Sequence, residues 1–359
     1  MVRSPLSHSS GRTTDTQRDP ASCDHLVVRL FRTPRRALKR GGLIAAANWP
    51  IVFVQGSADA LFKLVVTVPI VGGVFLGALI VGAEPRALLG LDYRDLPGTL
   101  LALLVARPLA LASFLAALAV ATVGGSVFIF LIKGGTVALL VRAEREAAAI
   151  EEPPLDAAAV ARASVFSIEG FIEASRDLFP RYLRLGGVLL LAYVASGLVF
   201  LAVAFGGVVG DGWFTPLLAT VVFVVWMTAV NLVYLLAQIV MAAEACNVAV
   251  ALRRVTGFVR KMPRTVGGVC LVVLGLIVLI TIAGVVAATA LGLIGFVPFV
   301  GLAVFPLQLL ALLLRGLVLQ YVALASIGAY SALYRGHASE SAAPAERLQA
   351  PQPVRAEAG

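Results

Sequence analysis

No charged residue occurs in the fifty-residue stretch Thr265–Leu314, which reads TVGGVCLVVLGLIVLITIAGVVAATALGLIGFVPFVGLAVFPLQLLALLL. A helix rises about 1.5 Å per residue and needs roughly 20 residues to cross a bilayer, so this stretch is long enough for two crossings. A soluble domain has no use for an apolar run of this length. The stretch therefore predicts two transmembrane helices in succession.

The composition of the whole chain extends this prediction. Of the 359 residues, 60% are hydrophobic and 14% are charged, and the mean hydropathy is +0.95. These values predict an all-α, polytopic transmembrane helical bundle. Segments 1–22 and 337–359 are predicted to be disordered tails around one transmembrane domain, 23–336. Its apolar runs predict six spans, at 61–82, 109–132, 187–209, 216–240, 267–290 and 301–323.

Basic residues alternate between the predicted connections. Lys and Arg number nine up to Arg40, seven from Lys133 to Arg184 and five from Arg253 to Arg264, against three, zero and zero in the other connections. Basic connections are retained in the cytoplasm during insertion. If the chain is bacterial, it is predicted to lie in the inner membrane with both termini cytoplasmic, which requires an even number of spans.

Two shorter apolar segments are not predicted to cross the membrane. Segment 41–58 contains Asn48, Pro50 and Gln55, and a seventh span would place one basic terminus outside. We expect it to be an interfacial or re-entrant helix, and segment 97–106 likewise on the outer side.

A degenerate pattern occurs three times, each time before a pair of spans. It consists of Pro-Arg followed by Gly-Gly, at Pro34-Arg35 with Gly41-Gly42, Pro180-Arg181 with Gly186-Gly187, and Pro263-Arg264 with Gly267-Gly268. Because Pro and Gly break helices, we interpret it as the turn from an interfacial amphipathic helix into the membrane. The alternative is that the Pro-Arg and Gly-Gly pattern recurs by chance. The pattern divides the domain into units 24–143, 157–240 and 241–335, with an acidic, solvated linker at 144–156.

Two of the predicted amphipathic helices, Val165–Tyr182 and Val248–Val259, have one apolar face and one charged face. We expect them to lie at the cytoplasmic headgroups, so anionic lipid is the predicted partner for the net charge of +9, rather than nucleic acid. A membrane-protein partner is also possible. The candidate contacts to lipid phosphate are Arg35, Arg181, Arg253, Arg254, Arg260, Lys261 and Arg264.

Polar side chains inside the predicted spans are candidate functional residues, because hydrocarbon offers them no partner. Asn231, Tyr234 and Gln238 form a stripe on the fourth span, which either lines a substrate path or bonds to a neighbouring helix. Gln308 and Arg315 share one face of the sixth span. Arg315 either binds an anionic substrate or lipid phosphate, extends to the headgroups, or pairs with a carboxylate such as that of Glu244.

Three charged residues near the ends of spans are predicted to be structural. Asp59 and Lys63 are spaced i,i+4 and neutralise each other as the first span begins. Lys133 is predicted to end the second span, within reach of water or headgroups.

The residues needed for common enzyme chemistries are missing from the sequence. There is no phosphate-binding GxxxxGK[ST] loop and no HExxH motif, and all three histidines fall in or beside the polar tails. The three cysteines, Cys23, Cys246 and Cys270, have no metal-ligand spacing. We therefore expect no catalytic site, no metal and no cofactor.

The closing segment Tyr321–Arg335 carries a family resemblance. Its Ala329-Tyr330 and Leu333-Tyr334-Arg335, together with basic amphipathic helices alternating with helix pairs, resemble a family of bacterial polytopic membrane proteins whose role is not established. They also resemble the membrane domain attached to some glycerophosphoryl diester phosphodiesterases. The resemblance covers residues 24–335 and implies the same membrane architecture. The catalytic domain of those fusions is absent, so their activity is not implied.

Two functions are consistent with the sequence. The first is a non-enzymatic membrane component that interacts with lipid or with envelope proteins through its basic helices. The second is a transporter or permease for a small or amphiphilic substrate. A cavity lined by the intramembrane polar residues would favour the second, whereas a solidly packed bundle would favour the first.

Overall fold

The computed structural model describes residues 21–81, 108–147, 150, 157–205, 214–295 and 300–349. Within these ranges the chain forms helices and no strand, which confirms the predicted all-α fold. The helices are α1 (Ala21–Ala47), α2 (Trp49–Val81), α5 (Pro108–Glu146), α6 (Ala157–Ala163), α7 (Ile168–Phe205), α8 (Phe214–Glu244), α9 (Val248–Lys261), α10 (Pro263–Gly295) and α11 (Val300–Gln349).

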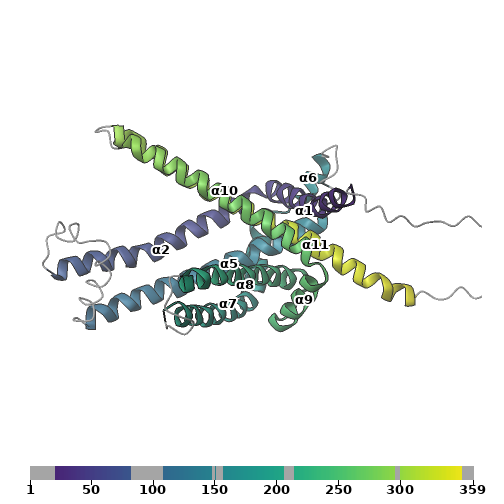
Figure 1. Ribbon diagram of the computed structural model, residues 1–359, viewed down its shortest axis with the longest axis horizontal. Helices are drawn as coiled ribbons and strands as arrows, with labels where there is room; N and C mark the ends of the chain where they lie inside the picture. Colours follow the sequence, from purple (N-terminus) through teal and green to yellow (C-terminus); the bar gives the residue numbers. More distant parts are fainter. Residues whose placement is uncertain are drawn as a thin grey trace, which may run out of the picture.

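Six of these helices are long and apolar enough to cross a membrane: α2, α5, α7, α8, α10 and α11. Each corresponds to one of the six predicted spans, although residue 82 of the first and residues 206–209 of the third lie outside the described ranges. Helices α2 and α5, α7 and α8, and α10 and α11 pack on each other, but α5 also packs extensively on α7, so the spans do not form three separate pairs. The long helices converge at one end of the molecule and diverge at the other (Figure 1). The protein is therefore a multi-pass, helical membrane protein.

The convergent end holds the tightly packed core. Helices α1, α6 and α9 gather there around the ends of the long helices (Figure 1). Large side chains that are fully buried at this end include Leu140, Tyr182, Met241 and Tyr330. Toward the divergent end, the helices instead expose leucine, valine and isoleucine on their outer faces. Such surfaces are stable only in lipid, so the membrane surrounds the divergent part.

Asn48 occupies the break between α1 and α2. Its side-chain nitrogen donates to the carbonyls of Ile44 (3.0 Å) and Ala163 (2.7 Å), and its Oδ1 accepts from the backbone N–H of Val165 (3.0 Å). This fully buried amide joins the end of α1 to the segment before α7. The prediction of one interfacial or re-entrant helix over 41–58 is wrong, because the chain breaks at Asn48 and α2 begins the first span at Trp49.

The amphipathic stretch before the third span is not a separate helix. It continues through Pro180 and Gly186-Gly187 into the span as the single helix α7, and Pro34 and Gly41-Gly42 likewise lie inside α1. The predicted turn into the membrane is therefore wrong for these two instances. Of the three prolines in the pattern, Pro263 alone begins a helix, at the first position of α10, where its missing N–H costs no bond.

The glycine pairs serve close helix packing. A Cβ added at Gly41 would lie 2.1 Å from the carbonyl oxygen of Ala325 on α11. One at Gly186 would lie 2.3 Å from the ring of Phe130 on α5, and one at Gly268 would lie 3.2 Å from Pro34 on α1. At Gly41 the neighbour is backbone, so only glycine allows α11 this close. At Gly186 and Gly268 a Cβ would instead require Phe130 or Pro34 to shift.

Helix α9 confirms the amphipathic pattern predicted for it. It buries Ala251, Val255 and Phe258 and exposes Arg253, Arg254 and Arg260. At the end of the chain, α11 extends to Gln349 instead of ending near residue 336, so the first part of the predicted tail 337–359 is helical. Residues 350–359, 1–20 and the predicted outer helix 97–106 lie outside the described ranges.

Candidate functional site

A cavity of about 600 Å³ lies between five of the six long helices. Its lining comes from α2, α5, α8, α10 and α11, and its size suits a small organic ligand. The wall is mostly apolar, and it includes Phe62, Leu274 and Ile277. Polar residues interrupt it toward both ends: Gln55, Thr136 and Gln238 toward the convergent end, and Ser126, Thr228 and Gln320 toward the divergent end.

Lys133 stands in the wall of the cavity rather than at the end of a span. Helix α5 continues beyond it to Glu146, which corrects the prediction that the second span ends at Lys133. Its ammonium lies 5.6 Å from the centre of the Tyr234 ring on α8, a cation–π geometry. It makes no hydrogen bond or ion pair with another residue in the described part of the chain.

Asp59 is the carboxylate of the cavity wall, and it is already paired. Its Oδ2 lies 2.6 Å from the Lys63 ammonium one turn along α2, as the i,i+4 spacing predicts. Lys63 itself points outward, with 70% of its side chain exposed. Asp59 also attracts Lys133, but within the described residues no carboxylate lies within ion-pair distance of the Lys133 ammonium.

Two further polar groups of the wall have no regular hydrogen-bond partner in the described part of the chain. The hydroxyl of Tyr234 and the Nε2 of Gln238 are buried and lie beside each other, but neither makes a hydrogen bond of normal geometry with a described residue. Both side chains come from α8, one turn apart, beside Lys133 on α5. By contrast, the Gln55 carbonyl in the same wall accepts a hydrogen bond from the Thr136 hydroxyl at 3.1 Å, so that part is satisfied internally.

Asn231, the third member of the predicted stripe, bonds mainly to protein. Its Oδ1 accepts from the Tyr193 hydroxyl on α7 at 2.5 Å, and its Nδ2 donates to the Met227 carbonyl at 2.8 Å. The side chain therefore joins α7 to α8, as the helix-bonding interpretation expects, while also lining the cavity rim. The stripe thus divides into a structural residue, Asn231, and two residues whose donors make no hydrogen bond of normal geometry within the described residues, Tyr234 and Gln238.

Gln308 and Arg315 do not reach this cavity. They share a face, as predicted, but they line a separate pocket of about 180 Å³ between α10 and α11. The Arg315 side chain packs over Gly284, and its Nε is buried without a hydrogen bond. It does not pair with Glu244, whose carboxylate contacts Arg254 and the Tyr334 hydroxyl instead.

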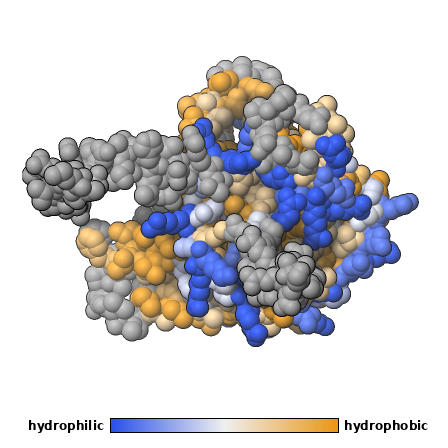
Figure 2. Space-filling model, turned by 90° about the vertical axis from the view of Figure 1, so that its right-hand side faces the viewer, coloured by the Kyte–Doolittle hydropathy of each residue, from blue (hydrophilic) through white to orange (hydrophobic). Residues whose placement is uncertain are grey.

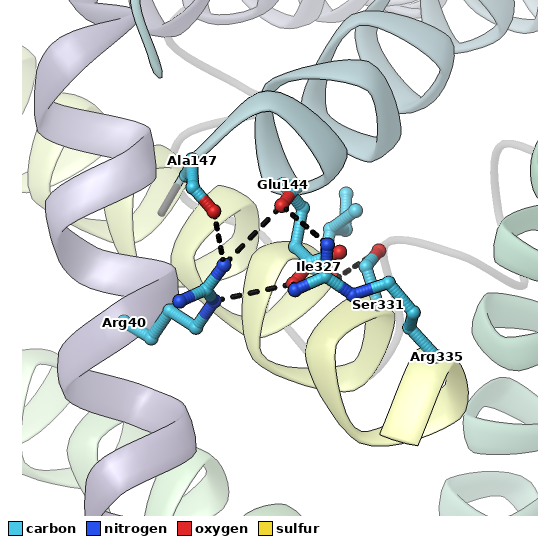
Figure 3. Close-up of polar contacts among 6 residues, drawn as sticks. All are labelled: Arg40, Glu144, Ala147, Ile327, Ser331 and Arg335. Atoms are coloured by element: carbon cyan, nitrogen blue, oxygen red, sulfur yellow. Dashed lines mark hydrogen bonds and ion pairs between the residues drawn. The ribbon is translucent and has the colours of Figure 1, made fainter. Parts of the chain in front are cut away.

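A buried ion cluster surrounds Glu144 at the convergent end (Figure 3). Glu144 is 1% exposed, and its Oε1 lies 3.1 Å from Nε of Arg40 and 2.8 Å from Nη2 of Arg335. Arg40 also donates to the Ala147 carbonyl at 2.8 Å. The prediction that 144–156 is a solvated acidic linker is therefore wrong at Glu144, while 151–156 lie outside the described ranges. The cluster is internally satisfied and structural.

Most of the candidate lipid contacts lie on the surface of the convergent end. Figure 2 views this end and shows hydrophilic residues gathered over it. The exposed candidates are Arg35 on α1, Arg253, Arg254, Arg260 and Lys261 on α9, and Arg264 at the start of α10, whereas Arg181 on α7 is partly buried. Arg254 contacts Glu244, so it is engaged with protein.

The sequence pattern did not indicate that Lys133 lines a cavity. A lone lysine between apolar residues is typical of the end of a span, and the packing that closes the cavity involves helices distant in sequence. One feature of the sequence could have indicated it: residues Gly134–Glu146 can continue the helix, which would place Lys133 well inside the helix and not at its end.

Within the described residues, no group of three or more His, Cys, Asp or Glu side chains is arranged to hold a metal ion. Comparisons with protein-family models, curated proteins and solved structures found no match to this chain.

Proposed function

We propose that this protein is a non-enzymatic permease that takes a small amphiphilic substrate into the central cavity and moves it through the membrane. The observation that carries the proposal is the cavity itself, whose mostly apolar lining also contains polar and charged side chains. A polar group of the substrate would lie against polar residues such as Gln55 and Lys133. Its apolar part would lie against residues such as Phe62 and Ile277.

A route into the cavity from lipid supports the proposal. Helices α8 and α10 both border the cavity, yet they are not among the helix pairs that pack extensively on each other. Figure 1 shows α10 running away from α8 toward the divergent end. Leu274 and Ile277 of α10 line the cavity and are also exposed on the surface. An amphiphile dissolved in the bilayer would therefore enter sideways, between α8 and α10.

The proposed orientation follows from the charges. The basic residues of α1, α9 and the start of α10 lie at the convergent end, which we place in the cytoplasm of a bacterium, with the long helices in the inner membrane. The even number of six crossings then puts both termini in the cytoplasm. This end would also contact anionic headgroups, which is a second, compatible role for the exposed arginines.

Lipid movement in reconstituted vesicles tests the proposal. The purified protein is placed in phosphatidylcholine vesicles with a fluorescent short-chain phospholipid, and dithionite bleaches the probe that reaches the outer leaflet. We expect the bleached fraction to exceed that of protein-free vesicles. Ala323→Trp, which fills the cavity, should remove the excess, whereas the exposed α2 variant Ala60→Trp should keep it. Equal bleaching with and without protein would contradict the proposal.

A further inference from the structure

Three donor groups of the residues that line the cavity make no hydrogen bond of normal geometry within the described residues. They are the Lys133 ammonium, the Tyr234 hydroxyl and the Gln238 amide nitrogen. Asp59 attracts Lys133 without forming an ion pair, and the Gln238 amide lies beside the Tyr234 hydroxyl. Gln238 is only 2% exposed, so burying its amide nitrogen without a hydrogen-bond acceptor carries the full desolvation penalty. Natural proteins retain such groups at a cost to stability, and a ligand that accepts hydrogen bonds would remove that cost.

The charge of the cavity wall indicates the sign of the charge that a bound ligand carries. Lys133 is a cation surrounded by apolar helices, and the wall's carboxylate, Asp59, is bound to Lys63 at 2.6 Å. A charge in a low-dielectric environment is strongly destabilising unless it is paired. An anion next to Lys133 would provide that pairing, whereas a cationic group would add repulsion.

The donor set gives the chemical class. Phosphate and carboxylate groups accept several hydrogen bonds at once, and bonds to charged acceptors are the strong ones. Lys133 comes from α5 and the other two donors from α8, so an anion between these helices lies beside all three. The Tyr234 hydroxyl and the Gln238 amide nitrogen are covered by protein atoms, so these two side chains must turn toward the anion to bind it. The apolar wall near Phe62 and Ile277 then remains for a hydrocarbon chain.

We propose that the cavity binds an anionic amphiphile, with its phosphate or carboxylate held by Lys133, Tyr234 and Gln238 and its chain against the apolar wall. This inference rests on the proposed permease function and specifies the substrate class. The same chemistry is offered by a phospholipid headgroup and by a free fatty acid, so the test includes both kinds of anion.

Cys270 provides a reporter inside the site. It lines the same cavity from α10 and is partly exposed. The chain has three cysteines, so Cys23→Ser with Cys246→Ser leaves Cys270 as the remaining thiol. This protein in phosphatidylcholine nanodiscs is treated with N-ethylmaleimide, and its labelling rate is measured with dodecyl phosphate, dodecanoate or dodecyltrimethylammonium present.

We expect Cys270 to react, and we expect dodecyl phosphate, dodecanoate or both to slow its reaction while the cation does not. Stronger protection by dodecyl phosphate would indicate a phosphate headgroup, and stronger protection by dodecanoate a fatty acid. Lys133→Met should raise the half-protecting concentration of the anion by at least about tenfold. Arg184→Met, which removes an exposed charge of α7 away from the cavity, should leave it unchanged.

The outcomes separate this inference from the function on which it rests. If Cys270 fails to react in folded protein, the cavity is closed and the permease proposal fails with it. If Cys270 reacts and is protected by the cation as well as by the anions, or equally in Lys133→Met, the cavity is open but the anionic class is wrong. A single elution peak in size exclusion confirms that each variant is folded.

Discussion

Nη2 of Arg335 lies 2.8 Å from Oε1 of Glu144, although the two residues are 191 positions apart in the chain. The same carboxylate oxygen lies 3.1 Å from Nε of Arg40. One buried carboxylate therefore joins α1, α5 and α11, the helices that close the convergent end. The cluster has no role in the proposed transport, but it holds α5 and α11, two helices of the cavity wall, against α1.

Glu144→Gln should destabilise the fold strongly. The substitution leaves Arg40 buried beside a neutral amide, and breaking a buried ion pair costs about 3 kcal/mol. The free energy of unfolding in mixed detergent micelles measures the loss. Glu146→Gln is the matched control, because Glu146 pairs with Arg142 on the surface and should matter little. Equal effects of the two variants would show that the Glu144 cluster is not a structural centre.

Gly41→Ala should separate α1 from α11. The new Cβ would lie 2.1 Å from a backbone oxygen of Ala325, which cannot move without shifting the helix, so we expect a loss of about 1–3 kcal/mol. Gly267→Ala meets open space and should be neutral or stabilising by up to about 1 kcal/mol, since alanine favours helix. Thermal unfolding in detergent compares them. An unchanged midpoint for Gly41→Ala would rule out the close approach.

Lys63→Met should weaken anion binding in the cavity even though Lys63 lies outside it. Without Lys63, the Asp59 carboxylate is left to neutralise Lys133, and it then competes with the substrate anion. Asp59→Asn should have the opposite effect, because it removes the negative charge of the wall. The concentration of dodecyl phosphate that half-protects Cys270 should rise several-fold in the first variant and fall in the second. Shifts in the same direction would contradict this charge balance.

Gln238→Leu should reduce binding without reducing stability. The Nε2 of Gln238 is buried without a partner, so an apolar side chain of similar size removes an unmet hydrogen bond. Residues kept for function often oppose stability in this way. We expect an equal or higher unfolding midpoint together with weaker protection of Cys270 by the anion. A clear drop in the midpoint would indicate that Gln238 is structural.

Arg315→Met should leave the central cavity unaffected. Arg315 belongs to the separate pocket between α10 and α11, where its buried Nε lacks a hydrogen bond. Removing a charge from a membrane span should raise the unfolding midpoint in neutral lipid. Protection of Cys270 should match that of the parent protein. A loss of protection would mean that the two pockets communicate.

The six spans were predictable because their signal is local and strong. An uncharged run such as Thr265–Leu314 has few alternatives to crossing a bilayer, whatever the rest of the chain does. The continuity of α7 was not predictable from Pro180, because a proline lacks one hydrogen bond but does not always end a helix. Pro180 is exposed at the convergent end, where water can satisfy the carbonyl that it leaves unpaired.

The candidate site was predictable only in part, for a geometric reason. Tyr234 and Gln238 were identified because their spacing on one helix is visible in the sequence. Their separation from Arg315, and their proximity to Lys133, depend on how α5, α8 and α11 are placed in space. The burial of Glu144 was missed for the same reason, since its partners Arg40 and Arg335 lie far away in the chain.

The contact between Gly41 and Ala325 also has a consequence for biosynthesis. Of the described helices, α1 leaves the ribosome before the others, whereas α11, against which it packs most closely, follows all of them. The docking face of α1 must therefore stay uncovered while the helices between them are made. The long helices can insert one after another, but the convergent end is completed only when α11 has been made.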